Sequence, residues 1–313
     1  MRILIYGTGG AGGYFGAQLA RAGEDVIFIA RGAHLQAIKR DGLRIETPEG
    51  EIVIQPAQAT DNPADAGKVD VVILGMKAWQ VMEAAEAMRP AIGPDTFVVP
   101  LQNGVDAPAE LAAALGTGHV AGGTCATISW LTAPGRIRSV MSTNFIRFGE
   151  LDNRPSERVG RLRDAFKRSG TNVEVPADIQ KALWSKFLVV TAFGGVGAVT
   201  RAPIGVTRTL PETRRMLEQC MEEVLDVGRA HGVAMIDNAV AESMSILDSI
   251  GANATASLQR DIAEGRPTEL DYWNGAVVRL GREAGVATPV HSFIYRSLLP
   301  LHLQAVGKVV LPA

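Results

Sequence analysis

The chain has 313 residues, enough for two domains with a sizeable core. Its 31 Lys and Arg residues nearly balance 33 Asp and Glu residues, and the formal net charge is −2. This balance, without a long run of like charge, argues against nucleic acid or an anionic membrane as the main partner. No apolar stretch reaches the ~20 uninterrupted residues of a membrane span. Because an apolar strand starts the chain, we expect no signal peptide.

The cysteines and histidines bear on the redox compartment and on metal binding. Cys125 and Cys220 are single and far apart, which is typical of reduced thiols in a cytoplasmic protein. The five histidines show no ligand spacing, so we expect no metal site.

The first thirty-one residues carry the clearest pattern. An apolar run at 2–6 predicts a buried strand, a helix is predicted from Tyr14 to Ala22, and 25–30 predicts a second strand. Between the first strand and the helix stands a glycine-rich turn, Gly7-Thr8-Gly9-Gly10-Ala11-Gly12. Strand, glycine turn, helix and strand together indicate a dinucleotide-binding unit of the Rossmann type. The alternative is a glycine-rich turn in some other α/β domain.

The roles of the glycines follow from this interpretation. Gly7 would allow the tight turn, Gly9 would let the backbone approach a pyrophosphate, and Gly12 would let helix and strand pack closely. The free N–H groups at the helix start would then face the phosphates.

The residue after the second strand indicates which nucleotide binds. An NAD site would have Asp or Glu there to hold the ribose 2′-hydroxyl, but the chain has Ala30-Arg31-Gly32. Arg31 could contact a 2′-phosphate with its planar fork of donors. The sequence therefore favours NADP(H), and the alternative for Arg31 is a solvated surface side chain.

Further strands are predicted along the first half. A hairpin is predicted over 43–54, and 69–75 and 96–101 predict buried strands followed by Lys77 and Asn103. Since ligands bind beyond the carboxyl ends of parallel strands, both residues would lie beside the cofactor. Taken alone, each is more simply a solvated Lys and a turn Asn. Three more strands are expected at 118–130, 135–141 and 144–150, then a helix and a last strand near 172–175.

From residue 177 the periodicity becomes helical throughout, with helices expected at about 178–193, 237–249, 254–264, 268–284 and 289–304. We therefore predict a Rossmann domain over residues 1–176 and an all-helical domain over 177–313.

Two charged residues of the helical half stand out. Lys186 lies in a nearly apolar helical segment, where it must snorkel, form an ion pair or face a cleft. Glu269 falls in the predicted first turn of a helix, where the electrostatics of the helix N-terminus would favour it, with Thr268 or a neighbour capping.

Taken together, these residues resemble the ketopantoate reductase (2-dehydropantoate 2-reductase) family over nearly the whole chain. The matching segments are the glycine motif, Arg31, Lys77-Ala78-Trp79-Gln80, Gln102-Asn103-Gly104, Leu183-Trp184-Ser185-Lys186, Thr268-Glu269-Leu270-Asp271-Tyr272 and Asn274-Gly275. The resemblance implies an NADP-binding Rossmann domain, a helical domain of the 6-phosphogluconate dehydrogenase type and an active site between them. It also implies NADPH-dependent reduction of 2-dehydropantoate to pantoate in pantothenate biosynthesis. A homodimer through the helical domain is one assembly that the sequence allows.

The resemblance also implies residue roles. Lys186 matches the proton donor and Glu269 the carboxylate paired with it, near the cofactor. Lys77 and Asn103 match residues near the nicotinamide ribose and substrate, Ser257 a position near the substrate carboxylate, and Ile128 a backbone contact to the cofactor.

The substrate pocket departs from the family pattern. The family's polar residues are replaced by Val190, Gly194, Ile204 and Ala254, and Asn253 lies one residue away from the last of these. Two other functions therefore stay open: a reductase for a more hydrophobic 2-oxo acid, and a non-catalytic NADP-binding sensor. Lys186 and Glu269 argue against the sensor, because a module that only binds NADP has no use for a lysine in an apolar cleft.

Overall fold

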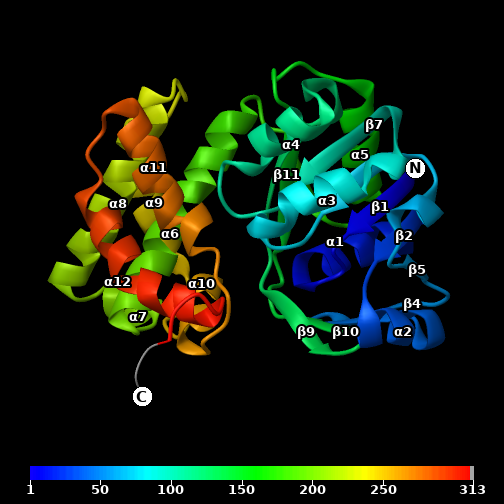
Figure 1. The fold of residues 1–313 in the computed structure, drawn as a ribbon, viewed down its shortest axis with the longest axis horizontal. Helices are drawn as coiled ribbons and strands as arrows, with labels where there is room; N and C mark the ends of the chain where they lie inside the picture. The colour runs from blue at the N-terminus through cyan, green and yellow to red at the C-terminus, as the bar shows by residue number, and fades with distance from the viewer. Residues whose placement is uncertain (311–313) are drawn as a thin grey trace. The chain divides into compact units, whose positions relative to one another are not determined.

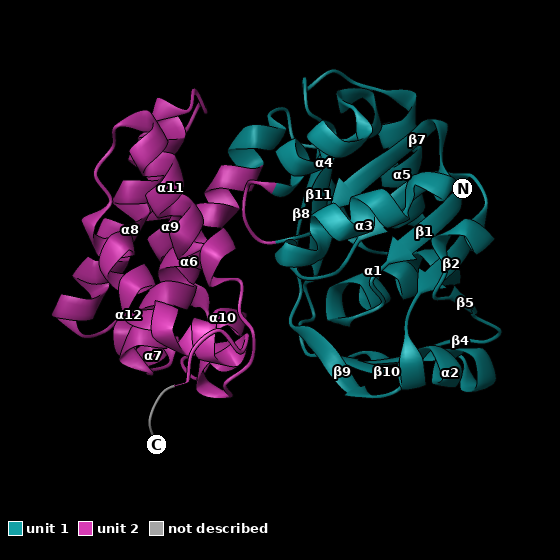
Figure 2. Ribbon diagram, in the orientation of Figure 1, with its two compact units in different colours: residues 1–102, 107–182 teal, residues 103–106, 183–313 magenta. Residues whose placement is uncertain are grey.

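The computed structural model describes residues 1–310, which fold into two compact units (Figure 1). Unit 1 comprises residues 1–102 and 107–182, and unit 2 comprises residues 103–106 and the chain from residue 183 onward (Figure 2). The units divide later than the predicted boundary after residue 176 because the next helix starts inside unit 1. There, Ile179 fills the space beside Gly122 and donates its N–H to Asn153 Oδ1 at 2.9 Å.

A five-stranded parallel sheet forms the centre of unit 1. Its strands in spatial order are β5 (Gln58–Thr60), β2 (Asp25–Ile29), β1 (Arg2–Tyr6), β6 (Val69–Leu74) and β7 (Ile92–Pro100). The chain runs outward from β1 on one side, then returns to place β6 on the other. This doubly wound order is that of a Rossmann domain, the fold class that the sequence predicted, and its switch point lies between β1 and β6.

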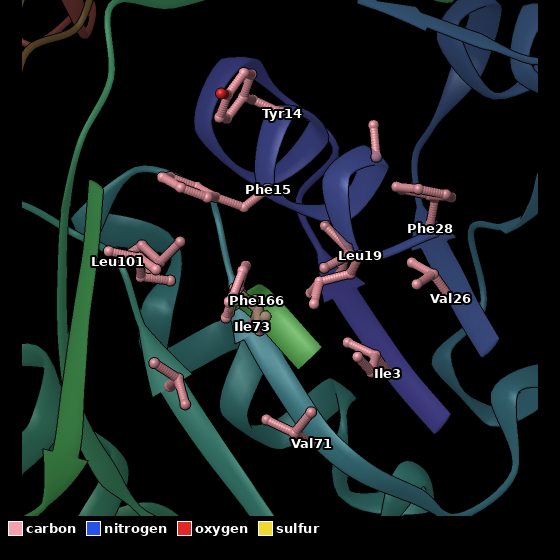
Figure 3. Close-up of a cluster of buried hydrophobic side chains, with 14 of the residues drawn as sticks. Ile3, Tyr14, Phe15, Leu19, Val26, Phe28, Val71, Ile73, Leu101 and Phe166 are labelled. Atoms are coloured by element: carbon pink, nitrogen blue, oxygen red, sulfur yellow. The ribbon is translucent and has the colours of Figure 1, made fainter. Parts of the chain in front are cut away.

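Both faces of this sheet are buried, because successive side chains of a strand point to opposite faces. Ile3 and Ile5 of β1 join Phe15 and Phe166 in one apolar cluster (Figure 3), while Leu4 joins a second cluster. Five helices accompany the sheet: α1 (Gly10–Arg21), α2 (Gly32–Asp41), α3 (Val81–Ala87), α4 (Ala107–Leu115) and α5 (Glu157–Arg168).

Two smaller sheets complete the described strands of unit 1. One has the order β4 (Gly50–Ile54), β3 (Leu43–Thr47), β10 (Arg136–Ser139) and β9 (Ser129–Ala133), and the other has β12 (Asn172–Glu174), β11 (Phe145–Glu150) and β8 (Ala121–Ala126). The predicted hairpin over 43–54 is confirmed as β3 and β4. The single strand predicted over 118–130 was wrong, because this stretch contributes β8 and β9 to different sheets.

The part of unit 2 that the structure describes is helical, as predicted. Its helices are α6 (Ile179–Thr200, which starts in unit 1), α7 (Ile204–Thr207), α8 (Pro211–Ala230), α9 (Ala239–Ser249), α10 (Ser257–Ala263), α11 (Asn274–Ala284) and α12 (Pro289–Ala305). By length and composition α6 could cross a membrane, but 61% of its most apolar window is buried and Ala192 and Val196 are fully enclosed. It is therefore the core helix of this unit.

Glycines on α6 make room for large side chains from other segments. A Cβ on Gly194 would lie 2.6 Å from the Trp273 ring, one on Gly195 would lie 2.5 Å from the Asn274 amide, and one on Gly197 would lie 2.5 Å from Gln259 Oε1. Glycine weakens a helix interior by about 1 kcal/mol relative to alanine. Close packing at each position offsets that cost.

The Gly194–Trp273 contact predicts a reversal of sign in a double-mutant cycle. Gly194→Ala alone should lower the free energy of unfolding by about 1–2 kcal/mol, because overpacking against a buried ring exceeds the gain in helix propensity. In a Trp273→Leu background, the same substitution should raise it by about 1 kcal/mol. Urea unfolding of the four proteins measures both steps. Equal effects of Gly194→Ala in both backgrounds would contradict the contact.

Candidate functional site

The glycine turn of unit 1 is closed by contacts between backbones. Gly7 has φ +99°, which favours glycine, and a Cβ on Gly12 would lie 2.2 Å from the Gly7 carbonyl oxygen. Gly75, at the end of β6, closes the contact from the other side, since its Cβ would lie 2.5 Å from Gly12 Cα. The predicted roles of Gly7 in the turn and Gly12 in close packing agree with this geometry.

The helix starts within the glycine motif. The sequence predicted a start at Tyr14, but α1 begins at Gly10, with Gly9 as its N-cap and no side chain capping its free N–H groups. Its first turn carries no acidic residue. The nearest atom to a Cβ on Gly9 would lie 3.8 Å away, whereas Gly10 is covered by the backbone of Ser129. Open backbone at Gly9 and uncapped amides form a cradle suited to an anionic pyrophosphate.

Arg31 lies beyond the carboxyl end of β2, as predicted. It is exposed, and its guanidinium nitrogen lies 3.8 Å from Glu83 Oε1 in an ion pair between exposed groups. Such a pair contributes at most about 1 kcal/mol. Tyr6 ends the adjacent β1, and burial raises the pKa of its hydroxyl while Arg31 opposes that rise. The described residues at this strand end therefore offer both a cation and an acid to a bound nucleotide.

The ends of β6 and β7 are tied together by an amide side chain. Gln102 donates its Nε2–H groups to the carbonyl oxygens of Leu74 at 3.2 Å and Met76 at 3.0 Å. Lys77 follows directly, with its Nζ 5.7 Å from the centroid of the Trp79 ring. The bonds of Gln102 were not predicted, because they join residues far apart in sequence. Ile128 is exposed, and its carbonyl oxygen accepts a hydrogen bond from Val140 N–H at 3.0 Å.

In unit 2, Lys186 lies on α6 one turn before Val190 and two turns before Gly194, so the three share one face. Lys186 and Val190 are half-buried, whereas Gly194 is buried against Trp273. Trp273 belongs to the segment that carries Glu269.

Glu269 lies before its helix rather than inside it. The prediction of a helix from residue 268 was wrong, because a short 3-10 helix, Leu270–Tyr272, intervenes and α11 begins only at Asn274. The Glu269 side chain is buried. The backbone carbonyl oxygen of Glu269 accepts hydrogen bonds from the N–H groups of Tyr272 and Trp273, both at 3.0 Å. Thr268 Oγ1 accepts the N–H of Leu270 at 3.0 Å, but the N-cap residue of this 3-10 helix is Glu269, without a side-chain capping bond.

The segment from Thr268 to Asn274 and α6 contact the neighbours of two other predicted site residues. Gly104, next to Asn103, lies against the carbonyl oxygen of Tyr272, which would be 3.0 Å from a Cβ at that position. Ala256, next to Ser257, packs beside Gly194 on α6. The chain next to Asn103 and the chain next to Ser257 thus contact, respectively, the segment that holds Glu269 and the helix that holds Lys186.

The residues that depart from the family's polar pattern form a largely apolar group. Ile204 is buried, and its N–H donates to the Ala254 carbonyl oxygen at 3.1 Å, so these two positions are neighbours. Asn253 is exposed, whereas Ala254 is half-buried. Trp273, which the sequence reasoning missed, fills the space that a side chain at position 194 would need. Its signal was a tryptophan facing a glycine, a relation that only the fold reveals.

Metal chemistry has no evident site in the part of the chain that the structure describes. Within residues 1–310, no three His, Cys, Asp or Glu side chains gather where they could hold an ion. Cys125 and Cys220 are both buried and form no disulfide.

Comparisons with known proteins agree with this arrangement. The family model described as "Ketopantoate reductase PanE/ApbA" matches residues 3–153, and its C-terminal counterpart matches residues 178–301. A 2-dehydropantoate 2-reductase from Mesorhizobium japonicum is 31% identical, over 92% of this chain and 94% of that protein. An uncharacterized oxidoreductase, YkpB of Bacillus subtilis, is 29% identical, over 95% of this chain and 98% of that protein. The crystal structure of a PanE/ApbA family ketopantoate reductase from Ralstonia eutropha has a TM-score of 0.89 at 29% identity, covering 98% of this chain and all of the other.

Proposed function

Because the chain belongs to the ketopantoate reductase family, we propose that it uses NADPH to reduce a 2-oxo acid to the 2-hydroxy acid. The first candidate substrate is 2-dehydropantoate, whose reduction yields pantoate for pantothenate biosynthesis. The observation that supports the proposal is that the segment holding Glu269 packs on α6, the helix holding Lys186, with Trp273 against Gly194 and Asn274 against Gly195.

NADPH would be held by the glycine turn, with Arg31 at the 2′-phosphate. The proposed cofactor residues are Gly7, Thr8, Gly9, Gly10, Ala11, Gly12, Arg31, Lys77, Asn103, Ile128 and Glu269. The cradle at Gly9 is compatible with either nicotinamide dinucleotide, so the preference for NADPH rests on Arg31 and on the missing acid after β2. When bound, NADPH would supply the hydride for the C2 carbonyl.

Lys186 would act on the carbonyl oxygen of the substrate. Negative charge develops on that oxygen as the carbonyl is reduced, and a nearby ammonium stabilises the charge and donates the proton. Glu269 is a buried carboxylate and would hold the ammonium in position. Asn103 and Ser257 would orient the substrate, with Ser257 near its carboxylate.

A second candidate substrate is a more hydrophobic 2-oxo acid. Val190 and Ala254 offer no side-chain donor or acceptor, and Trp273 fills the position beside Gly194. A substrate hydroxyl left without a partner in such a pocket costs about 1–3 kcal/mol. A substrate that lacks the hydroxyl avoids this cost.

Localisation and assembly are part of the proposal. We expect the enzyme in the cytoplasm, where its two thiols would stay reduced. A homodimer would form through unit 2, where Phe293 on α12 is 58% exposed.

Cofactor choice gives the next prediction. Arg31→Ala should weaken NADPH binding by roughly 1–3 kcal/mol and barely change NADH binding, because only NADPH carries the phosphate. Glu83→Gln is the matched control and should tighten NADPH slightly, since it removes the acid beside Arg31. Titration of both nucleotides measures these affinities. Equal affinity of the unmodified chain for NADPH and NADH would refute the preference.

Proton donation gives a second prediction for this site. Lys186→Ala should lower kcat by about 10²–10⁴, the usual range of general acid catalysis, while NADPH still binds. Lys181→Ala, in the first turn of the same helix, should leave kcat unchanged. Steady-state kinetics on the best 2-oxo acid decide whether Lys186 donates the proton or only reaches solvent as a snorkelling side chain. If kcat of Lys186→Ala stays within a few fold, Lys186 is only a snorkelling side chain.

The substrate itself gives a third prediction. We expect little discrimination between ketopantoate and its deoxy analogue, 2-oxo-3,3-dimethylbutanoate, because the pocket lacks the polar residues that would hold the pantoyl hydroxyl. Each missing hydrogen bond costs about 0.5–1.5 kcal/mol. The measurement is kcat/KM for the two acids side by side. A preference for ketopantoate above about 10²-fold would mean that other groups have rebuilt the polar contacts.

A further inference from the structure

His34, near the start of α2, connects two segments that lie far apart in the sequence. Its Nε2 lies 2.8 Å from the carbonyl oxygen of Thr8, in the glycine turn. Its Nδ1 accepts the N–H of Gly135, between β9 and β10, at 2.9 Å. A carbonyl oxygen can only accept, so Nε2 carries the proton and Nδ1 does not. The two partners therefore fix a neutral imidazole in one tautomer.

The bond to Thr8 sets the direction of the next amide. In a trans peptide the C=O and the following N–H point in opposite directions. Holding Thr8 O toward His34 thus aims the N–H of Gly9 away from α2. The Thr8 hydroxyl and the Thr8 N–H, which belongs to the preceding peptide, both donate to the Ile29 carbonyl oxygen, at 2.8 and 3.1 Å, and so anchor Thr8 to the end of β2.

The bond to Gly135 holds the β9–β10 hairpin on the glycine turn and α1. The Ser129 carbonyl oxygen would lie 2.1 Å from a Cβ on Gly10, and Ile137 Cδ1 would lie 2.2 Å from one on Gly13. The hairpin therefore packs directly on the first turn of α1, where glycines allow it. Ile128, a proposed cofactor contact, immediately precedes the hairpin.

Charged side chains lie near this connection on α2, β3 and β10. Arg44 of β3 and Arg136 of β10 line a cavity next to Gly135, together with Asp41 at the end of α2, and Arg31 precedes α2. Arg44 forms an ion pair with Glu51 at 3.1 Å and Arg31 forms one with Glu83 at 3.8 Å, so acids offset these cations. Burial lowers the pKa of His34, and the hydrogen bond to Thr8 opposes that effect.

We propose that His34 is a positioning residue for the dinucleotide site. Its neutral ring holds the Thr8–Gly9 peptide and the β9–β10 hairpin together, and protonation of Nδ1 releases the hairpin and weakens dinucleotide binding. Protonation replaces an acceptor with a donor that faces the Gly135 N–H, so this bond is lost while the bond to Thr8 stays. Affinity should therefore fall as the pH drops below the usual histidine range. The inference rests on the proposed function only in requiring that a nicotinamide dinucleotide binds the glycine turn.

Calorimetric titration of the full chain with NADP⁺ and with NAD⁺, between about pH 7.5 and about pH 5.5, tests the proposal. NAD⁺ lacks the 2′-phosphate, whose own protonation would otherwise confuse the result. For the unmodified chain we expect weaker binding of both dinucleotides at the lower pH, approaching a limit of about tenfold as His34 becomes fully protonated, the size expected for one hydrogen bond. His34→Gln, which does not titrate and can still donate to Thr8, should bind NAD⁺ equally at both pH values.

The matched control is His119→Gln, because His119 also donates from a ring nitrogen to a backbone carbonyl, that of Thr96. It should keep the pH dependence of the unmodified chain. A second readout is ¹⁵N NMR of the histidine ring without cofactor, which should show the Nε2–H tautomer, with a pKa that falls when NAD⁺ is added. This readout does not depend on any variant folding.

The outcomes separate this inference from the proposed function. The same loss of NAD⁺ affinity in His34→Gln as in the unmodified chain would overturn the positioning role alone. An Nδ1–H tautomer would overturn it as well. A chain that binds neither dinucleotide at any pH would overturn both. A purely structural His34 would lower the melting temperature of His34→Gln without flattening its pH dependence.

Discussion

The architecture of unit 1 depends on one close backbone contact, where the start of α1 lies directly on β1 and β6. Gly7, Gly12 and Gly75 meet there with no space for a Cβ on any of them. This contact places the uncapped N–H groups of α1 at the switch point of the sheet. The anion cradle is thus formed by backbone packing, and no polar side chain is needed to create it. Side chains then act on its orientation and on the choice of nucleotide, as we propose for His34 and Arg31.

Unit 2 uses the same physical device for a different purpose. Glycines on α6 admit Trp273, Asn274 and Gln259 from other segments. The core helix α6 therefore packs closely against both α10 and the start of α11. Asn274 donates its side-chain N–H to the Thr191 carbonyl oxygen at 3.3 Å, which pins the start of α11 against α6. The segment that carries Glu269 therefore has little freedom relative to the helix that carries Lys186. The roles that we propose for Lys186 and Glu269, proton donor and partner carboxylate, would need this kind of rigid support.

Local patterns in the sequence predicted much of the fold, because apolar runs and glycine turns act over a few residues. Four of the five central strands and the helical second half were predicted in this way, whereas the short edge strand β5 was not. Pairing between distant strands, such as β10 with β3, has no local signal. The helix start at residue 268 failed for a local reason instead. Trp273 has φ −108° and ψ −95°, outside the helical region, so the helix restarts only at Asn274.

The site shows the same division between local and distant signals. Lys186 and Glu269 attract notice as charges in apolar surroundings, and Arg31 by its place after a strand. Gly75, His34 and Trp273 acquire meaning only through partners far along the chain: Gly12 for the first, Gly135 for the second and Gly194 for the third. Their residue types alone are ordinary, so sequence reasoning had no basis for choosing them.

Cofactor and substrate differ in how readily a sequence reveals them, because they are distinguished by different forces. A 2′-phosphate adds about two negative charges, and one cation or acid at a single position shifts its binding. A substrate hydroxyl can be held by any nearby donor or acceptor, including the backbone. The absence of polar side chains therefore does not by itself decide whether the hydroxyl has a hydrogen-bond partner. Here, however, the nearby backbone is already engaged: Ile204 N–H donates to Ala254, Gly205 N–H donates to Ala252, and Asn253 is exposed. These two backbone donors are therefore already engaged, which supports our proposal of an apolar 2-oxo acid as the second candidate substrate.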